Sequence, residues 1–294
     1  MTGTVSNQIK ILSKEINNAR KDSKAVQIIL ISIALIFFTV ILLVPLISVF
    51  VKAFDQGVKL YLASISDPIA LKAIQLTLLT IGIAVPINTV FGLTIAWAVA
   101  KFRFKGKNLL ITFIDLPFSI SPIVAGLIFV LLFSTTHGLF APQLNAWNLQ
   151  IIFAPPGIIL ATLFVTLPFV ARELIPLMEA QGTAEEEAAL TLGASGWKTF
   201  LLITLPNVKW ALLYGVMLTT ARAAGEFGAV SVVSGHIRGL TNTIPLHVEI
   251  LYNEYKFTAA FAVASLLTII AILNLMIKNI VDWKIKQQDK MSLM

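Results

Sequence analysis

Six apolar runs, each long enough to form a membrane-spanning helix, follow one another along this chain. A helix needs about 20 mainly apolar residues to cross the hydrocarbon core of a bilayer, and a backbone in hydrocarbon must satisfy its own hydrogen bonds. The sequence therefore predicts an all-α integral membrane protein with six transmembrane helices. The runs cover approximately residues 26–51, 71–100, 109–133, 157–178, 209–233 and 257–281.

The composition excludes a soluble globular protein. Of the 294 residues, 57% are hydrophobic and 13% are charged, whereas about a quarter of the residues in an average soluble domain are charged. The first run (26–51) is longer than the core of a signal peptide, which spans about 7–15 residues, so we expect it to stay as a membrane anchor. The absence of cysteine excludes disulfides and thiolate metal sites.

Positive charge is divided unequally between the segments that connect the runs. If the N-terminus is cytoplasmic, the segments on that side carry sixteen Lys and Arg residues and those on the opposite side carry five. Membrane proteins keep such an excess in their cytoplasmic segments, so both termini are predicted to be cytoplasmic. The net charge of +7 then reflects orientation in the lipid bilayer, and no nucleic-acid partner is expected. The predicted organisation is a cytoplasmic tail (1–25), a single transmembrane domain (26–283) and a second cytoplasmic tail (284–294).

The polar segment between the fourth and fifth runs is predicted to form two short helices. Thr183 and Glu186 match a capping box at the start of the first helix, and Gly193 suits the left-handed backbone that ends such a helix. Ser195 can cap the second helix, and Pro206 is expected to stop it before the next span. Two interpretations are open: a hairpin lying on the bilayer surface, or a docking site for another protein.

Three charged residues lie in or beside the predicted spans, where a charge costs at least about 2.5–3.5 kcal/mol on insertion scales. Arg222 and Glu226 are four residues apart, which puts them on one face of the fifth helix. They form either a structural ion pair that fixes the helix register, or a site where Arg222 faces a translocation path and attracts an anion. For Asp115, two roles are open: capping the helix segment after the break at Pro117, or pairing with a cation on a partner.

Small residues recur in the same part of the fifth run. Ala221, Gly225 and Ala229 follow one another at intervals of four. Such a row lets two membrane helices approach closely, so a close helix contact is predicted there.

No residue pattern predicts a catalytic, metal or nucleotide site. The three histidines (His137, His236 and His247) lie in predicted outer loops without the spacing of metal ligands, and are expected to be surface or loop residues. The sequence lacks the GxxxxGK[ST] loop that cradles nucleotide phosphates. No cofactor is therefore expected on this chain, and the energy for any transport must come from a partner or an ion gradient.

The polar segment carries the signature of a known family. Glu-Ala-Ala is followed after three residues by Gly, and after nine more by Ile-x-Leu-Pro. This pattern resembles the EAA loop of ABC-importer permeases, and the resemblance implies a type I permease bundle whose loop (about 179–208) couples to a cytoplasmic ABC ATPase dimer. It favours the docking interpretation. The matching positions are Glu187, Ala188, Ala189, Gly193, Ile203, Leu205 and Pro206.

A second resemblance concerns the cargo. The stretch Ala-Arg-x-x-Gly-Glu-Phe-Gly-Ala, which begins at Ala221, is similar to oxyanion-importer permeases. Its continuation, Ser-Gly-His-Ile-Arg-Gly-Leu-Thr-Asn-Thr, resembles the W-type subunits of bacterial sulfate/thiosulfate importers. The resemblance implies an inner (plasma) membrane permease for sulfate or thiosulfate. Its implied partners are a sister T-type permease subunit in a heterodimer, a periplasmic sulfate-binding protein, and the ATPase, which uses ATP and Mg.

Three alternatives to this function remain open. The first is a molybdate or tungstate permease of the same family. The second is an ion-coupled secondary anion transporter, with Glu226 and Asp115 as proton relays. The third is a structural membrane protein whose loop anchors a complex. Uptake without ATP by the chain alone would favour the second, and intact transport after loop mutations that preserve assembly would favour the third.

Overall fold

A computed structural model describes residues 24–292 of the chain, and in this range every regular element is helical. The all-α prediction is therefore confirmed. The chain divides into two compact units, Met1–Val51 and Lys52–Met294, each of which is treated by itself. Of the two expected tails, residues 1–23 and 293–294 lie outside the described residues.

A single apolar helical run forms the described part of the first unit. Helix α2 (Lys24–Phe38), the π-helical turn η1 (Thr39–Leu43) and helix α3 (Val44–Ala53) follow without a break. The run Val26–Ala53 has 28 residues, long and apolar enough to cross a membrane, and corresponds to the first predicted span. Its large side chains are exposed along most of its length.

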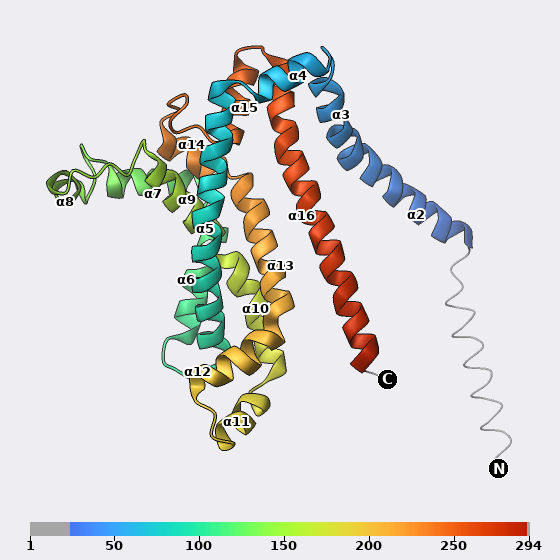
Figure 1. Ribbon diagram of the computed structural model, residues 1–294, viewed down its shortest axis with the longest axis vertical. Helices are drawn as coiled ribbons and strands as arrows, with labels where there is room; N and C mark the ends of the chain where they lie inside the picture. The colour runs from blue at the N-terminus through green and yellow to red at the C-terminus, as the bar shows by residue number, and fades with distance from the viewer. Residues whose placement is uncertain (1–23, 293–294) are drawn as a thin grey trace. The chain divides into compact units, whose positions relative to one another are not determined.

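Three long helices pack together in the second unit: α5 (Pro68–Lys101), α10 (Pro168–Gln181) and α13 (Leu205–Ala224) (Figure 1). Glycines allow their close approach. A Cβ built on Gly92 of α5 would lie 2.6 Å from the Cβ of Val170 on α10, and one on Gly215 of α13 would lie 3.1 Å from the Cα of Val170. The buried side chains of this contact are Ala96, Val170, Leu174, Met178 and Val208.

The fourth and fifth spans differ from their predicted bounds. Helix α9 (Pro155–Thr166) continues into α10 as one span of 27 residues, Pro155–Gln181. The fifth prediction (209–233) is wrong at its end, because α13 stops at Ala224 and a separate helix α14 (Gly228–Ser234) follows. Glycines at both sides of this break interrupt the helix without lowering the hydropathy that defined the run.

The third predicted span (109–133) is not one helix. Helices α6 (Lys107–Ser119) and α7 (Pro122–Phe133) are bent by 107° at the break between them. The residue before a proline avoids the helical backbone, and Ser121 is accordingly extended, with ψ of 135°. Among the described residues five helices are long and apolar enough to span a membrane, and six spans result if the bent pair counts as one.

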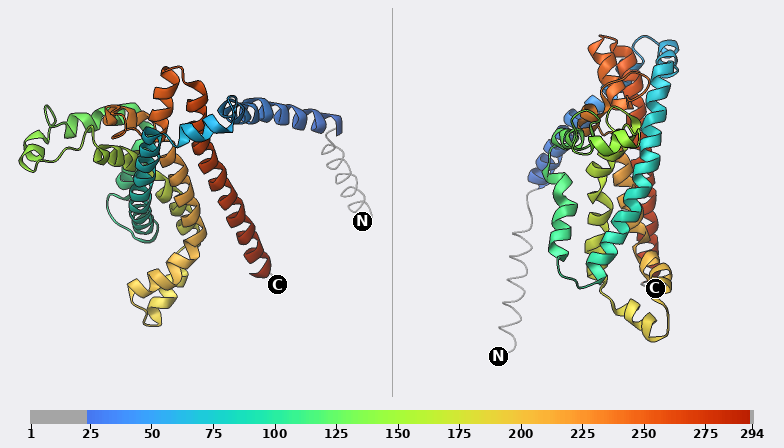
Figure 2. Two further views of the ribbon diagram at one scale, coloured as in Figure 1. Left: turned by 45° about the horizontal axis from the view of Figure 1, so that its top comes forward. Right: turned by 90° about the vertical axis from the view of Figure 1, so that its left-hand side faces the viewer.

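The two ends of the second unit carry different short helices. At one end, α4 (Val58–Ile65) and α15 (Ile244–Asn253) surround the start of α16 (Phe257–Ser292), where the hydroxyls of Tyr61 and Ser265 lie 3.1 Å apart. This end is called the far end. At the other, which we call the hairpin end, lie α11 (Ala184–Thr191), α12 (Gly196–Thr199) and the π-helical turn η2 (Phe200–Thr204) (Figure 2). Helix α8 (Ala141–Ala146) follows α7.

Candidate functional site

The hairpin, residues 183–204, is built as a helix, an elbow and a second helix. Gly193 forms the elbow with φ of 86°, which confirms the left-handed backbone predicted there. The Oγ of Ser195 accepts a hydrogen bond from the backbone N–H of Lys198 at 3.4 Å, so the predicted cap of the second helix is confirmed as well. Gly193 and Ser195 therefore set the turn between the two helices through their own backbone conformation and a short-range hydrogen bond.

Pro206 does not stop the second helix, contrary to the prediction. Helices α12 and α13 are joined through η2 into one run of 29 residues, Gly196–Ala224. Pro206 occupies the first turn of α13, where a proline is tolerated, and the preceding π turn shifts the hydrogen bonds, with the N–H of Leu205 donating to the carbonyl of Phe200. The 20 residues of α13 alone span about 30 Å, which is enough for the hydrocarbon core.

The predicted capping box is also wrong. Thr183 makes no side-chain cap, and its Oγ1 donates instead to the Oε1 of Glu187 at 2.6 Å. Glu186 turns toward α5, where its Oε1 lies 2.7 Å from the Nζ of Lys101. A charged partner from another helix thus outcompetes the local cap.

The hairpin contacts the end of α5 through an ion pair and aromatic rings. The ring centroids of Trp97 and Phe200 are 4.7 Å apart, and those of Trp197 and Phe200 are 5.6 Å apart. A cavity of about 270 Å³ lies beside these contacts, lined by Trp97, Lys101 and Glu186 among others. One face of the hairpin is therefore held against the membrane helices.

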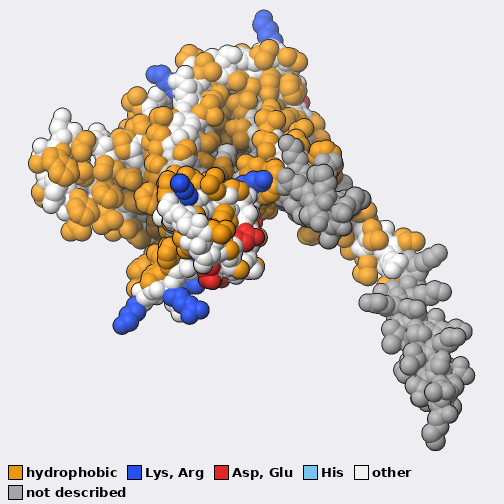
Figure 3. All heavy atoms as spheres, turned by 60° about the horizontal axis from the view of Figure 1, so that its bottom comes forward, with side chains coloured by type: hydrophobic (Ala, Val, Ile, Leu, Met, Phe, Trp, Pro, Cys, Tyr) orange, Lys and Arg blue, Asp and Glu red, His pale blue; other side chains and the backbone are white. Residues whose placement is uncertain are grey.

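The other face of the hairpin exposes large apolar side chains. Leu192 is 88% exposed and Trp197 is 66% exposed. Leu201 and Leu202 are exposed as well, and Leu190, which lines the cavity, is 51% exposed. Figure 3 shows this end of the unit, where charged side chains gather around the hairpin while hydrophobic side chains cover the flanks. Apolar groups exposed among charges are typical of a protein-docking surface.

The signature residues are distributed over both faces. Glu187, Ala188 and Pro206 are exposed, whereas Ala189, Ile203 and Leu205 are half-buried. Together with the exposed apolar side chains, they form a partly apolar projection at this end of the unit.

Arg222 and Glu226 meet as predicted, although not on one helix. An Nη of Arg222 lies 3.0 Å from the Oε2 of Glu226, and their side chains are 38% and 1% exposed. Glu226 lies past the end of α13, and its Oε1 accepts a hydrogen bond from the N–H of Ala229 at 3.0 Å. The carboxylate therefore joins α13 to α14, and the guanidinium keeps donors open to the surroundings.

The prediction that the row of small residues lies on one helix is also wrong, because α13 ends at Ala224. Ala221 and Ala229 belong to different helices, because the chain breaks at Gly225. Ala229 nevertheless lies in a close contact, since a Cβ built on Gly126 of α7 would be 2.8 Å from its carbonyl oxygen. The close approach is between α7 and α14.

Asp115 pairs within the chain. The predicted cap is wrong, because the N-cap residue of α7 is Ser121, whereas pairing with a cation on a partner stays a prediction. The Oδ1 of Asp115 lies 2.7 Å from the Nε of Arg172 on α10, with side chains 32% and 56% exposed. Arg172 also lies 4.9 Å from the centre of the Phe118 ring. Arg172 lies inside the fourth predicted run (157–178), and this position was the signal in the sequence that it needed a partner there.

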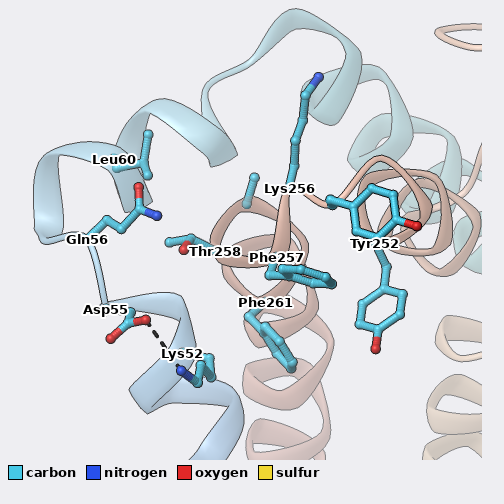
Figure 4. A pocket seen from close by; sticks show the side chains of 11 residues that line it. Lys52, Asp55, Gln56, Leu60, Tyr252, Lys256, Phe257, Thr258 and Phe261 are labelled. Carbon is cyan, nitrogen blue, oxygen red and sulfur yellow. Dashed lines mark hydrogen bonds and ion pairs between the residues drawn. The ribbon is translucent and has the colours of Figure 1, made fainter.

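The far end contains two further cavities, of about 650 and 270 Å³. Figure 4 shows the larger one, which is lined by Phe257 and Phe261 of α16 and by the paired side chains of Lys52 and Asp55. His247 lines the smaller one; it lies in α15 and is 5% exposed, contrary to the prediction of a surface or loop histidine, and its burial lowers its pKa.

Ion pairs fasten the chain at the far end. Glu254 pairs with Lys256, at 3.0 Å, and with Arg238. Hydrogen bonds from these two cations lower the pKa of the Glu254 carboxyl, and the bond from Lys256 has the larger effect. Among the described residues, no cluster of three or more His, Asp or Glu side chains could hold a metal ion.

The chain is similar in sequence to a family of transport proteins and to several of its members. The family model described as "Binding-protein-dependent transport system inner membrane component" matches residues 88–286. The "Sulfate transport system permease protein CysW" of Escherichia coli (strain K12) is 51% identical over 261 residues, which are 89% of this chain and 89% of that protein. The "Sulfate transport system permease protein CysT" of the same strain is 36% identical, over 82% of this chain and 87% of its own length.

The fold also has a solved counterpart. A chain in the crystal structure of a bacterial alginate ABC transporter, in complex with an alginate pentasaccharide-bound periplasmic protein, superimposes with a TM-score of 0.74. The alignment covers 92% of this chain and 97% of that chain, at 18% sequence identity. At this identity the likeness establishes the fold alone.

Proposed function

Because the chain belongs to the family of binding-protein-dependent transport system inner membrane components, we propose that it is the permease subunit of an ABC importer for sulfate or thiosulfate. The hairpin carries the mechanical role, and the membrane helices carry the anion path. ATP and Mg are used by a partner ATPase dimer, and this chain contributes no catalytic residue. The cargo is inferred from the relatives, whose printed names specify sulfate transport.

The observation that supports the mechanical part is the exposed apolar face of the hairpin, which we place on the cytoplasmic side of the membrane. Leu192 and Trp197 remain 88% and 66% exposed, although Trp197 stacks on Phe200. Their burial in a cleft of a cytoplasmic ATPase would stabilise a complex. The Gly193 elbow fixes the angle between α11 and α12, so that the hairpin moves as a rigid piece. Closure of the ATPase dimer would then rock the membrane helices between inward-open and outward-open states.

The partners follow from the same placement. A sister T-type permease would complete the pore as a heterodimer, since this chain has relatives named for both types of subunit. A periplasmic sulfate-binding protein would deliver the anion at the far end. Both termini would then be cytoplasmic, because the hairpin must face the ATPase.

Arg222 is the candidate anion contact in the membrane. Its neighbour Glu226 is buried and fixes one Nη, while the guanidinium remains 38% exposed. A guanidinium held by one edge can still donate from its other nitrogens to an oxyanion. Arg222→Gln separates this role from a purely structural one: normal assembly with failed anion transport supports the path, whereas lost assembly with lower thermal stability supports a structural ion pair.

Reconstitution tests the whole proposal. The chain is incorporated into proteoliposomes with the T-type permease, the ATPase and the sulfate-binding protein, and ATPase stimulation and uptake of radiolabelled anion are measured. We expect binding protein loaded with sulfate or thiosulfate to stimulate both activities. Stimulation by a molybdate-loaded or tungstate-loaded protein alone would overturn the cargo assignment, and uptake without ATP by this chain alone would identify a secondary transporter.

A further inference from the structure

A buried ion pair joins the hairpin to the end of α5. The Nζ of Lys101 lies 2.7 Å from the Oε1 of Glu186, and their side chains are only 6% and 15% exposed. The same Nζ donates to the carbonyl of Gly182, the last residue before the hairpin. Lys101 therefore holds both the entrance of the hairpin and the first turn of α11.

The carboxylate of Glu186 extends this connection to the second arm of the hairpin. Its Oε1 also accepts a hydrogen bond from the Oγ1 of Thr204, at 3.2 Å. Thr204 is buried and ends η2, just before α13 begins. One carboxylate thus binds α5, α11 and η2 at a single point, which restrains the hairpin in more than one direction.

A second Lys–Glu pair at the same end of the unit provides a comparison. The Nζ of Lys107 lies 3.0 Å from the Oε1 of Glu179, with side chains 32% and 47% exposed. This pair joins α6 to α10 and does not touch the hairpin. Because exposed ion pairs contribute little and buried ones leave a costly charge when one partner is removed, the two pairs should respond differently to the same substitution.

We propose that Lys101 is a positioning residue that locks the hairpin to α5, so that a displacement of the docked hairpin is passed directly to that membrane helix. The proposal rests on the proposed function, since it assumes that an ATPase moves the hairpin. Helix α5 then receives the displacement together with α13, which is covalently continuous with η2. Without the lock, the hairpin can follow the ATPase while α5 stays in place.

The test compares Lys101→Gln and Glu186→Gln with Lys107→Gln in the complete reconstituted complex. Glu186→Gln keeps the shape and the acceptor for Thr204 but removes the charge, and Lys101→Arg keeps the cation. We expect Lys101→Gln and Glu186→Gln to retain ATPase activity but to transport at least about fivefold less sulfate per ATP hydrolysed, the lower range of typical coupling between sites. Lys107→Gln should change this ratio by less than about twofold, as expected for an exposed pair, and Lys101→Arg should restore it.

Hydrogen exchange provides a readout that needs no transported anion. In the purified complex, amides of residues 184–204 should exchange faster in Lys101→Gln than in the parent chain and in Lys107→Gln. An unchanged transport-to-ATP ratio in both Lys101→Gln and Glu186→Gln, equal losses in Lys107→Gln, or unchanged exchange in the hairpin would each overturn the proposal. Failure of the parent complex to transport sulfate would instead refute the proposed function, and the exchange measurement would still decide whether the lock exists.

Discussion

Gly193 is the residue whose backbone decides whether α11 and α12 can fold back on each other. Its φ of 86° costs a side chain with a Cβ about 1–2 kcal/mol, while asparagine adopts this region more readily. We expect Gly193→Ala to weaken recovery of the ATPase with the membrane complex, and Gly193→Asn to retain more of it. Gly196→Ala is the matched control, because Gly196 is helical and its Cβ would meet nothing within 4 Å. Equal recovery for Gly193→Ala and the control would contradict the role of the elbow.

Residues whose structure depends on near neighbours could be predicted from the sequence, and those with distant partners could not. Gly193 and Ser195 act on groups within a few positions, so their roles followed from helix-capping chemistry. Glu186 and Asp115 instead bind cations from other helices, Lys101 and Arg172. A capping pattern in the sequence cannot reveal such a partner, since the competing group arrives only when the helices pack.

The contact between α5 and α10 depends on the absence of a side chain at Gly92. A Cβ there would lie 2.6 Å from the Cβ of Val170 and 3.2 Å from the backbone N of Ala171. We expect Gly92→Ala to force the helices apart and to lower the free energy of unfolding by about 1–3 kcal/mol, as other overpacked sites do. Thermal unfolding of the purified complex measures the change.

Gly82 of the same helix supplies the control for this substitution. Its Cβ would meet nothing within 4 Å, so Gly82→Ala should be neutral or stabilise by about 0.5–1 kcal/mol through helix propensity. Equal destabilisation at both positions would show that the close approach of α5 and α10 does not limit stability.

Helix α15 introduces a dependence of stability on pH through His247. Burial lowers the pKa of this imidazole below its ordinary value of 6.5, so the unfolded chain binds the proton more readily than the folded one. The free energy of unfolding should therefore fall as the pH drops below 6.5, until the pH passes the lowered pKa. Thermal unfolding of the complex between about pH 7.5 and 5.5 should show this fall, and His247→Gln should reduce it. His137 is exposed and serves as the control. If His137→Gln reduced the pH dependence of stability equally, the burial of His247 would not be its cause.

The ends of the helices were harder to predict from the sequence than their presence. Hydropathy identified all six runs, because burial in lipid requires apolar side chains over a whole span. It placed the end of the fifth helix nine residues too late, at 233 instead of Ala224, because the following short helix is equally apolar. The bend between α6 and α7 was missed for the same reason, although the Ser121–Pro122 pair was a local signal for it.

The bent pair decides how many times the whole chain crosses the membrane. Helix α6 starts at the hairpin end, where Lys107 contacts Glu179 of α10. The span Pro155–Gln181 also finishes at this end, so it must begin at the opposite side. The chain can reach that side only if the segment from α6 to α9 crosses the membrane once. The bent pair therefore counts as one span, which makes six candidate spans among the described residues.

Single-cysteine labelling tests this count, because the chain contains no cysteine of its own. An even number of crossings places both termini on one side of the membrane, and an odd number places them on opposite sides. Cysteines at Ser6 and Ser292 should both be protected from an impermeant maleimide added to the outside of the inner membrane, as should a cysteine at Lys105, between α5 and α6. A cysteine at Tyr255, which is 81% exposed at the far end, should react. Labelling of one terminal cysteine but not the other would mean five crossings. One of the six candidate spans would then not cross the membrane, and the hairpin could no longer share its side of the membrane with both termini.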